Sequence, residues 1–441
     1  MTRSFGKQMV GVAKLQVLTV IIGLFTQIYL ARLLGPEQKG ILDLFLLAPA
    51  ILASLIDLGL LSANTYFGGK RQISVRVLHS HSLYWALIAS CLLIGAGLLL
   101  HDPISRLFKG LSGWSLLAAV ALAGPTMYIS LWSSLMYGID RVRIVYVFNT
   151  VAGAGALLLY FVLGTLFGSG MSVFLVATTI LTIAKAITAF LISGSESAPI
   201  LGLDVGALKK SLRYGFPLYF GLIVNALHFR LSQIFVNLVT GASDLANFAL
   251  ATRIAEMMWL MDYAIINASI FRITSTNVEE AAEITKRMSR IVGSMIFLAS
   301  FTAALAAPVV IPLIFGEAFS PTVTPLIILL PGVLLWSLGR ILAQFIAYQM
   351  GRSWLNMGAS VAAFVVNVVL MILLVPRFGI IGAAVATSLS YACNYSILAQ
   401  AFLRITKVEI SSIMIPTRED LKLAVRVMSD QVTIFRHKQD H

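Results

Sequence analysis

The sequence predicts an all-α, polytopic membrane protein with about twelve transmembrane helices. Of its 441 residues, 59% are hydrophobic and 12% are charged, whereas a soluble domain is nearer half apolar and a quarter charged. The apolar residues form successive long stretches along the whole chain, and about 20 such residues cross a ~30 Å hydrocarbon core as a helix. Because these stretches lack the polar–apolar alternation of barrel strands, we expect helices.

Gly, Pro and charged residues divide the apolar stretches into two sets of six segments. The first set covers residues 10–34, 40–62, 78–101, 114–138, 144–168 and 170–193. The second set covers residues 214–240, 245–272, 290–315, 322–350, 354–375 and 378–404. Residues 194–213 contain Ser, Pro, Gly and two lysines, which is typical of a linker. We therefore predict two pseudo-symmetric lobes, residues 1–193 and 214–404, joined by a cytoplasmic linker, residues 194–213.

Short motifs recur in the two halves at a nearly constant offset, which predicts parallel repeats. The matched pairs are Gly35-Pro36-Glu37 with Gly241-Ala242-Ser243, Pro125 with Pro331, and Phe167-Gly168 with Phe378-Gly379. Six helices in each half give repeats related by an axis along the membrane normal, with a substrate site between the lobes. This organisation is more typical of transporters than of membrane enzymes.

Basic residues are concentrated in alternate loops, which predicts the orientation of the chain. Two clusters on the same side are Lys70, Arg71 and Arg76, and Lys209, Lys210 and Arg213. By the positive-inside rule, this side is cytoplasmic, and both termini lie there. The first apolar segment continues to Leu34 without a small-residue cleavage site, so we expect it to remain as a helix.

The tail, residues 405–441, carries a second helical pattern. Thr417 is suited to cap a helix, and Leu421 and Val425 then share one face. This pattern predicts either a cytoplasmic amphipathic helix on the membrane surface or a short soluble helix without lipid contact.

Three segments carry a family resemblance. The first runs from Ala31 to Glu37 and continues with Gly40 and Ile56–Leu60; the second is Tyr214–Pro217 with Gly241 and Phe248–Ala251; the third runs from Asn367 through Pro376–Ala384 to Ser388. Together they resemble the polysaccharide-biosynthesis flippases, the O-antigen (Wzx-type) translocases of the MOP exporter superfamily. Two positions depart from the family pattern, because Phe248 and Phe378 stand where Tyr is frequent.

This resemblance covers the chain from the first helix to the tail and carries a functional expectation. It implies a two-lobed, MOP/MATE-like carrier of the bacterial inner membrane. Such a carrier moves undecaprenyl-diphosphate-linked oligosaccharides from the inner to the outer leaflet by alternating access. The expected partners are this cargo, membrane lipids and possible glycan polymerase or assembly proteins, with no cofactor.

A diphosphate head needs a wet, cationic passage, so polar residues deep within the helices are the candidate cargo-binding residues. Arg230 shares a helix face with Gln233 and Asn237, and Arg340 shares one with Gln344. For both arginines the alternative is a structural ion pair or carbonyl capping between helices. The further candidates are Lys185, Arg253, and the polar stripe of the first helix that includes Gln16 and Gln27.

Three acidic residues are candidates for ion coupling or gating. Asp262 lies deepest in its predicted helix. The alternative for Glu256 is an ion pair with Arg253, three residues before it on the same helix face. The alternative for Asp57 is contact with water or with a basic residue of the following loop. Counter-transport of H⁺ or Na⁺ through these acids is one possible source of directionality. The membrane potential is the other, since it acts on two outward-moving negative charges with about 4–5 kcal/mol per 100 mV.

Other classes of function have less support in the sequence. Cys91, Cys393 and His228 are not spaced in the sequence as the ligands of a metal site would be. The sequence contains no phosphate-binding loop of the Gly-x-x-x-x-Gly-Lys-Ser/Thr type. The basic residues lie in separate loops, which does not indicate nucleic-acid binding. A cation-coupled drug antiporter of the same superfamily is the first alternative, although the deep charges are mainly basic. A membrane-embedded glycan polymerase or ligase is the second alternative. Such an enzyme usually needs a large external loop to hold its active site, whereas the longest external loop expected here has about a dozen residues. We therefore expect that the protein is not an enzyme.

Overall fold

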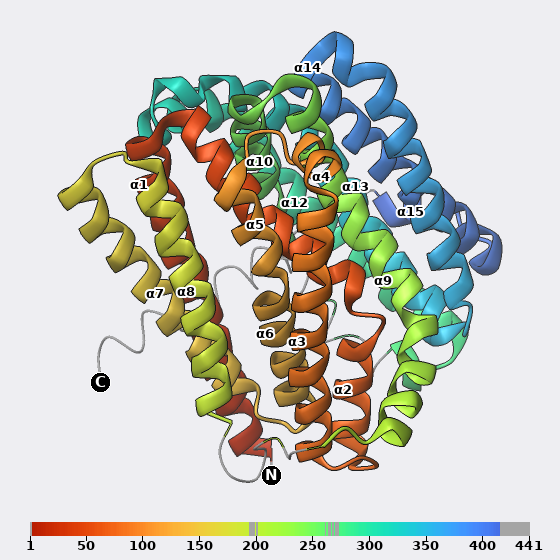
Figure 1. Cartoon of the computed structure of the whole chain (residues 1–441). Helices are drawn as coiled ribbons and strands as arrows, with labels where there is room; N and C mark the ends of the chain where they lie inside the picture. Colours follow the sequence, from red (N-terminus) through yellow and green to blue (C-terminus); the bar gives the residue numbers. More distant parts are fainter. Residues whose placement is uncertain are drawn as a thin grey trace, which may run out of the picture. The chain divides into compact units, whose positions relative to one another are not determined.

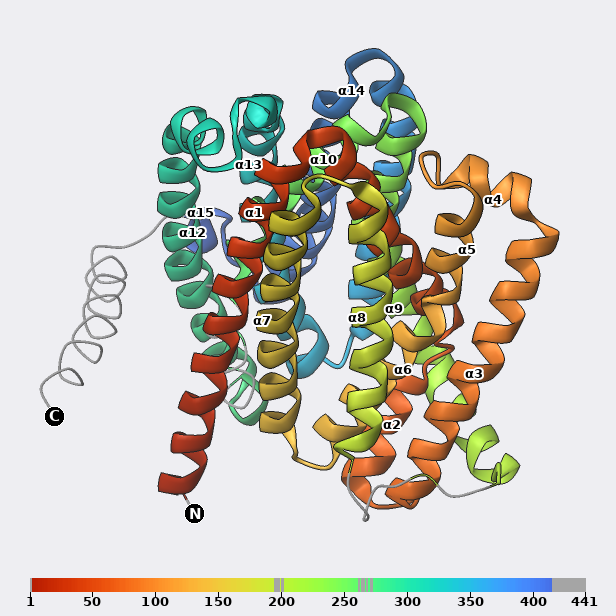
Figure 2. The same cartoon turned by 60° about the vertical axis from the view of Figure 1, so that its left-hand side comes forward.

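The computed structural model describes residues 2–193, 199, 202–260, 262, 266, 269 and 273–414. Within these residues the chain consists of helices and contains no strand. The first part of the linker, part of the predicted helix 245–272 and the tail from residue 415, including the pattern at Thr417, lie outside the described residues. Figure 1 and Figure 2 show the helices from two directions.

The first half of the chain begins with a long helix that contains a break. The helices in chain order are α1 (Thr2–Ile56), α2 (Leu60–Lys70), α3 (Val75–Leu99), α4 (His101–Leu107), α5 (Gly113–Ala121), α6 (Ala123–Gly138), α7 (Val142–Phe167) and α8 (Met171–Leu191). Gly35 interrupts α1 with a φ of 67°, so that α1 contains the predicted segment 10–34 and the first part of 40–62. The external loop predicted between residues 101 and 114 includes the short helix α4.

The second half follows the same pattern. Its elements are α9 (Val205–Thr240), α10 (Ala242–Glu256), α12 (Val278–Phe315), the 3₁₀ helix η1 (Glu317–Thr322), α13 (Val323–Gln344), the π-helix η2 (Phe345–Gln349), α14 (Ser353–Thr406) and α15 (Ser411–Met414). Gly379 interrupts α14 with a φ of 56°, so that α14 contains the predicted segments 354–375 and 378–404. Asp204 caps α9, which therefore begins before the predicted residue 214.

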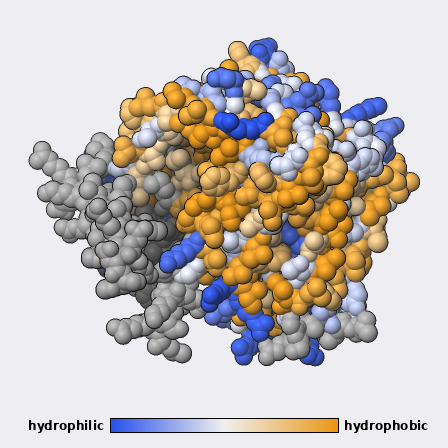
Figure 3. Space-filling view, turned by 90° about the vertical axis from the view of Figure 1, so that its left-hand side faces the viewer, coloured by the Kyte–Doolittle hydropathy of each residue, from blue (hydrophilic) through white to orange (hydrophobic). Residues whose placement is uncertain are grey.

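Eight helices of the described residues are long and apolar enough to cross a membrane, or nine if the bent helix α9 counts as one span. Two of the eight spans, Lys14–Ile56 and Ser353–Thr406, are long enough to contain two predicted segments each. On the face shown in Figure 3, hydrophobic residues cover most of the surface that is not grey. Exposed residues such as Leu166, at 69%, are expected where a helix faces lipid, because soluble proteins avoid large apolar surfaces.

The chain divides into two compact units. The first comprises Met1–Ala246 with Ile314–Phe319, and the second comprises Asn247–Leu313 with Ser320–His441. Helix α9 groups with the first unit because it packs along α2. The predicted division into lobes rests on internal symmetry rather than on contacts, and it stays a prediction.

The backbone at the repeated glycines supports the predicted repeat. Gly35 and Gly241 have φ/ψ angles of 67°/175° and 99°/−178°, and each separates two successive helices. Gly168 and Gly379 have angles of 61°/−140° and 56°/−135°. Residues with a side chain rarely adopt these positive φ values. The two halves therefore use glycine for the same backbone turn at equivalent places.

Asp57 ends the second part of the long helix and starts α2. Its carboxylate oxygens accept hydrogen bonds from the backbone N–H groups of Gly59, at 3.1 Å, and Leu61, at 2.9 Å. Leu58 and Gly59 adopt left-handed conformations at this break. Asp57 is buried and compensates the free N–H groups that every helix start leaves. The structure therefore gives Asp57 a capping contact, while its predicted gating role stays a prediction.

Helix α9 contacts this break through glycine. A Cβ atom on Gly215 would lie 2.1 Å from the carbonyl oxygen of Gly59, and a Cβ on Gly59 would lie 2.1 Å from that of Gly215. Beside this contact, the Tyr219 hydroxyl donates a hydrogen bond of 2.6 Å to the Leu55 carbonyl. The Tyr214 ring stacks on Tyr66 with centroids 4.3 Å apart. The two backbones approach closely because neither residue has a side chain.

We predict that Gly215→Ala destabilises the protein, since overpacking at a rigid backbone contact costs about 1–3 kcal/mol. Gly221→Ala in the same helix is the matched control, because a Cβ at Gly221 meets no atom within 4 Å. Thermal unfolding of the two purified variants measures the difference. The apparent Tm should fall by several degrees for Gly215→Ala alone. Equal midpoints for the two variants would contradict this packing.

Candidate functional site

A cavity of about 430 Å³ lies in the first unit between α1, α7 and α8, and we call it the polar cavity because eight of its 14 lining residues are polar. Figure 1 and Figure 2 both show α7 and α8 beside α1. The polar residues that line the cavity are Gln16, Thr19, Tyr146, Asn149, Tyr160, Thr178, Thr182 and Lys185. Among the described residues that line it there is no carboxylate. The cavity therefore offers hydroxyl, amide and ammonium groups within membrane-spanning helices.

Helical spacing explains why these residues face the same space. On α7, the lining residues 146, 149, 153, 156 and 160 recur at intervals of three and four and so share one face. Thr19 and Thr150 share a hydrogen bond of 2.7 Å that joins α1 to α7. Tyr160 and Thr178 share one of 2.8 Å that joins α7 to α8. These contacts satisfy part of the polar groups and hold the walls of the cavity together.

Lys185 is the cation of this cavity. Its side chain is half-buried, and its ammonium nitrogen lies 5.7 Å from the centroid of the Phe148 ring. No ion pair of Lys185 is found within the part of the chain that the structure describes. A cation over an aromatic face gains some electrostatic compensation, but less than a carboxylate partner would give when desolvated. Lys185 therefore remains available to a negatively charged ligand.

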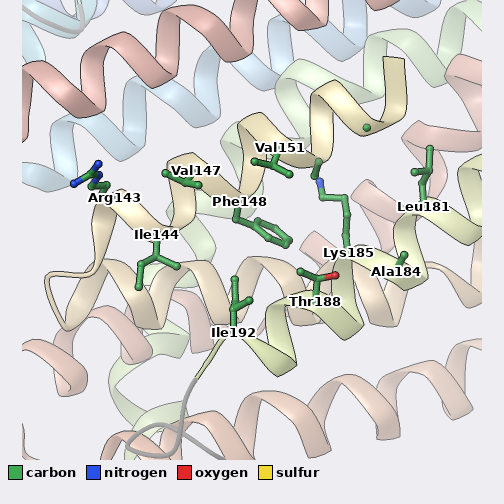
Figure 4. A pocket seen from close by; sticks show the side chains of 12 residues that line it. Arg143, Ile144, Val147, Phe148, Val151, Leu181, Ala184, Lys185, Thr188 and Ile192 are labelled. Atoms are coloured by element: carbon green, nitrogen blue, oxygen red, sulfur yellow. The ribbon is translucent and has the colours of Figure 1, made fainter. Parts of the chain in front are cut away.

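An apolar cavity of about 590 Å³ adjoins Lys185 between α7 and α8. Figure 4 shows the Lys185 side chain between the two helices, with Arg143 near the start of α7. Apart from Arg143, Lys185 and Thr188, the residues that line this cavity are apolar or glycine. Lys185, Ala152 and Leu181 line both cavities. A polar space and an apolar space therefore meet at one lysine.

The other predicted cargo-binding residues lie in different surroundings. Arg230 and Arg253 are exposed, and Gln27 is half-buried. Gln233 and Asn237 are buried on α9, where the Asn237 side chain donates a hydrogen bond of 2.7 Å to the Lys109 carbonyl. The structure thus brings together Gln16 and Lys185 from the predicted set, and their roles in binding stay predictions.

The residues that sequence reasoning missed are mainly on α7. Tyr146, Asn149 and Tyr160 line the polar cavity, and Arg143 lines the apolar one. Their spacing on one helix face, together with Thr182 three residues before Lys185, was a signal that could have identified them. The segment 144–168 was interpreted only as an apolar span.

With this geometry described, the chain can be compared with known proteins. A sequence model of the family described as polysaccharide biosynthesis protein matches residues 10–271, which is more than half of the chain. The chain belongs to this family. The resemblance inferred from its motifs is therefore confirmed at the level of the family. No curated protein matches the chain in sequence.

Solved structures show that this family member has the fold of MOP superfamily transporters. An inward-facing multidrug resistance MATE family transporter has a TM-score of 0.70 at 16% identity, and the aligned region covers 89% of this chain and 96% of the transporter. The lipid II flippase MurJ, in an inward closed conformation, has a TM-score of 0.70 at 14% identity, and the aligned region covers 98% of this chain and 99% of MurJ. A MOP superfamily transporter from Pyrococcus furiosus has a TM-score of 0.62 at 15% identity, and the aligned region covers 91% of this chain and 95% of that transporter. The predicted fold class, a helical MOP/MATE-like protein with about twelve transmembrane helices, is confirmed.

The second unit of this family member contains an ion pair between a buried carboxylate and a half-buried arginine. The Arg340 guanidinium forms a hydrogen-bonded ion pair with Asp262, and their side chains are 22% and 0% exposed. The guanidinium also lies 5.4 Å from the centroid of the Trp259 ring. The structure therefore shows the ion-pair alternative that the sequence left open for Arg340. It joins a predicted cargo-binding cation to a predicted coupling acid, and both roles stay predictions.

The remaining candidates in the second part of the chain, Glu256 and Gln344, line neither of the two cavities described above. Glu256, at the end of α10, is half-buried, and Gln344, at the end of α13, is buried. Among the described residues, no group of three or more His, Cys, Asp or Glu side chains could hold a metal ion.

We predict that Arg340→Met and Asp262→Leu each destabilise the protein, because an uncompensated charge remains buried at a cost of about 3–5 kcal/mol. The double variant Arg340→Met/Asp262→Leu should recover most of the lost stability, since it buries no charge. The apparent Tm of the four purified proteins gives the coupling between the two positions. A double variant as unstable as the two single variants would show that the pair is not the source of the effect.

Proposed function

We propose that the chain is a flippase that carries an undecaprenyl-diphosphate-linked oligosaccharide from the inner to the outer leaflet of a bacterial inner membrane. The observation that carries this proposal is Lys185, a membrane-embedded cation that lines a polar cavity free of carboxylates among its described residues. Family membership supports a role in polysaccharide biosynthesis. The named neighbours include both a lipid flippase and multidrug transporters, so the fold alone does not choose between them.

The charge of the cavity favours an anionic cargo. A diphosphate carries about two negative charges, and an ion within the hydrocarbon region is costly unless a charge or water compensates it. Lys185 can donate charge-assisted hydrogen bonds to phosphate oxygens, which are shorter and stronger than neutral ones. An antiporter for cationic drugs would instead need an acid in this position. The absence of a carboxylate from the described lining therefore supports the flippase over the antiporter.

The remaining lining of the cavity suits a saccharide. Gln16 and Asn149 supply amide donors and acceptors, and Tyr146 and Thr182 supply hydroxyl groups. Sugar hydroxyls both donate and accept hydrogen bonds, so such a lining replaces the water that a sugar loses on entering. One site can thus compensate the charged and the neutral parts of the head together.

Orientation and energy source complete the proposal. The positive-inside pattern supports cytoplasmic termini, and the proposed cargo enters from the cytoplasmic leaflet. Outward movement of negative charge is favoured by an interior-negative potential, at roughly 2.3 kcal/mol per charge per 100 mV. Counter-transport of H⁺ or Na⁺ through Asp262, Glu256 or Asp57 is the competing source. Since Asp262 is already neutralised by Arg340, the potential is the simpler of the two.

We predict that Lys185→Met lowers glycan display at the cell surface more than tenfold in a strain that lacks its own copy. The reason is that the phosphate would then enter the cavity without a compensating charge. Lys185→Arg should retain part of the activity, because it keeps the cation. Surface glycan and lipid-linked oligosaccharide on the inner leaflet are measured together, at matched protein levels.

The control is Lys209→Met, which removes an exposed lysine of α9. Equal glycan display by Lys185→Met and Lys209→Met would contradict the proposed role of Lys185. Loss of display without build-up of lipid-linked oligosaccharide on the inner leaflet would contradict a block at the flipping step.

A further inference from the structure

The apolar cavity between α7 and α8 has a different character from the polar cavity beside it. Its lining is formed by residues of α7 and α8 and by Ile192 directly after α8, and Figure 4 shows Phe148 of α7 between the two segments, near Thr188 and Ile192. Its volume of about 590 Å³ lies within the range of small-molecule sites. Val151 is 65% exposed, so the cavity is open at its edge rather than sealed.

Helix α7 separates the two cavities by its two faces. Residues 146, 149, 153, 156 and 160 face the polar cavity, whereas residues 144, 147, 148, 151 and 155 face the apolar one. Each set recurs at helical spacing. Lys185, on the neighbouring helix, is the charged residue that lines both. Polar residues therefore line one cavity, apolar residues line the other, and the cation Lys185 lies where the two cavities meet.

We propose that the apolar cavity binds the part of the cargo's polyprenyl chain nearest the phosphate, while the phosphate lies at Lys185 and the saccharide in the polar cavity. This inference rests on the proposed function. A lipid-linked saccharide has one polar end and one apolar end, and its anionic phosphate is the junction between them. The two cavities have the same order, with the cation at their junction.

The cavity is too small for a whole polyprenyl chain, so it holds a short segment while the remainder extends through the open edge into lipid. Lipid tails are as apolar as the cavity wall, so burial there gives little net affinity. The contribution of the cavity is therefore space beside the cation, which accommodates the first segment of the chain when the phosphate lies at Lys185. A glycerophospholipid presents two acyl chains on a glycerol at that point and fits the single junction less well.

This reasoning determines which variants are informative. Because the wall adds little affinity, trimming it should matter less than filling the space. A Cβ at Gly155 meets no atom within 4 Å, so Gly155→Phe can extend a ring into the cavity from α7. Ala184 lines the cavity from α8, and Ala184→Phe fills it from the opposite side. The control is Gly95→Phe, since a Cβ at Gly95 in α3 likewise meets nothing within 4 Å.

The experiment measures binding to the purified full chain in nanodiscs, with undecaprenyl phosphate and inorganic diphosphate as separate probes. The double variant Gly155→Phe/Ala184→Phe should bind undecaprenyl phosphate at least tenfold more weakly than wild type and Gly95→Phe, because the rings block the space that the attached chain must enter when the phosphate reaches Lys185. Its binding of inorganic diphosphate should be unchanged, because Lys185 remains. Lys185→Met should weaken the binding of both probes.

Three results would overturn the inference. The first is equal binding of undecaprenyl phosphate by the double variant and Gly95→Phe. The second is displacement of undecaprenyl phosphate by an equal concentration of phosphatidylglycerol, which would make the cavity a general lipid site. The third is weakened binding of inorganic diphosphate by the double variant, which would indicate a distorted site. None of these results changes the display measured for Lys185→Met, so failure here is distinguishable from failure of the proposed function.

Discussion

A charge within the hydrocarbon region of a membrane must be compensated, and this chain compensates its deep charges in two different ways. In the second unit, Asp262 and Arg340 neutralise each other, and the Trp259 ring covers the guanidinium. In the first unit, Lys185 has an aromatic ring and a hydroxyl-rich cavity beside it instead of an acid. In the first arrangement the two charges offset each other within the protein, whereas our proposal is that a bound anion offsets the charge in the second. The functional proposal depends on this difference.

The helix α7, which packs beside the helix of Lys185, presents two kinds of chemistry on its two faces. Helix α7 is amphipathic within the membrane, with a polar face toward α1 and an apolar face toward the seam with α8. Hydrogen bonds from Thr150 and Tyr160 fix α7 to its neighbours. In our proposal this wall lets an amphipathic cargo keep its head and its chain in separate surroundings.

The fold was largely predictable from the sequence, because long apolar segments and glycine breaks are local signals. Gly35 lies between two predicted segments and Gly379 is the second residue of the last one, and both interrupt helices in the structure. The candidate site was predictable only in part. Lys185 and Gln16 stand out as polar residues in apolar segments, but Tyr146 and Asn149 belong to a helix whose polar face is a minority of its surface. The partner of Arg340 could not be read from the sequence, since Asp262 lies 78 residues away and meets it only through tertiary packing.

The central claim is that Lys185 binds the phosphate of a lipid-linked saccharide. The most direct measurement is an experimental structure of the chain with its lipid-linked oligosaccharide bound in a lipid nanodisc. The account predicts a phosphate oxygen about 2.7–2.9 Å from the Lys185 Nζ atom, with the first isoprenyl units between α7 and α8. A phosphate held by other cations, with the space around Lys185 filled by water or membrane lipid, would contradict it.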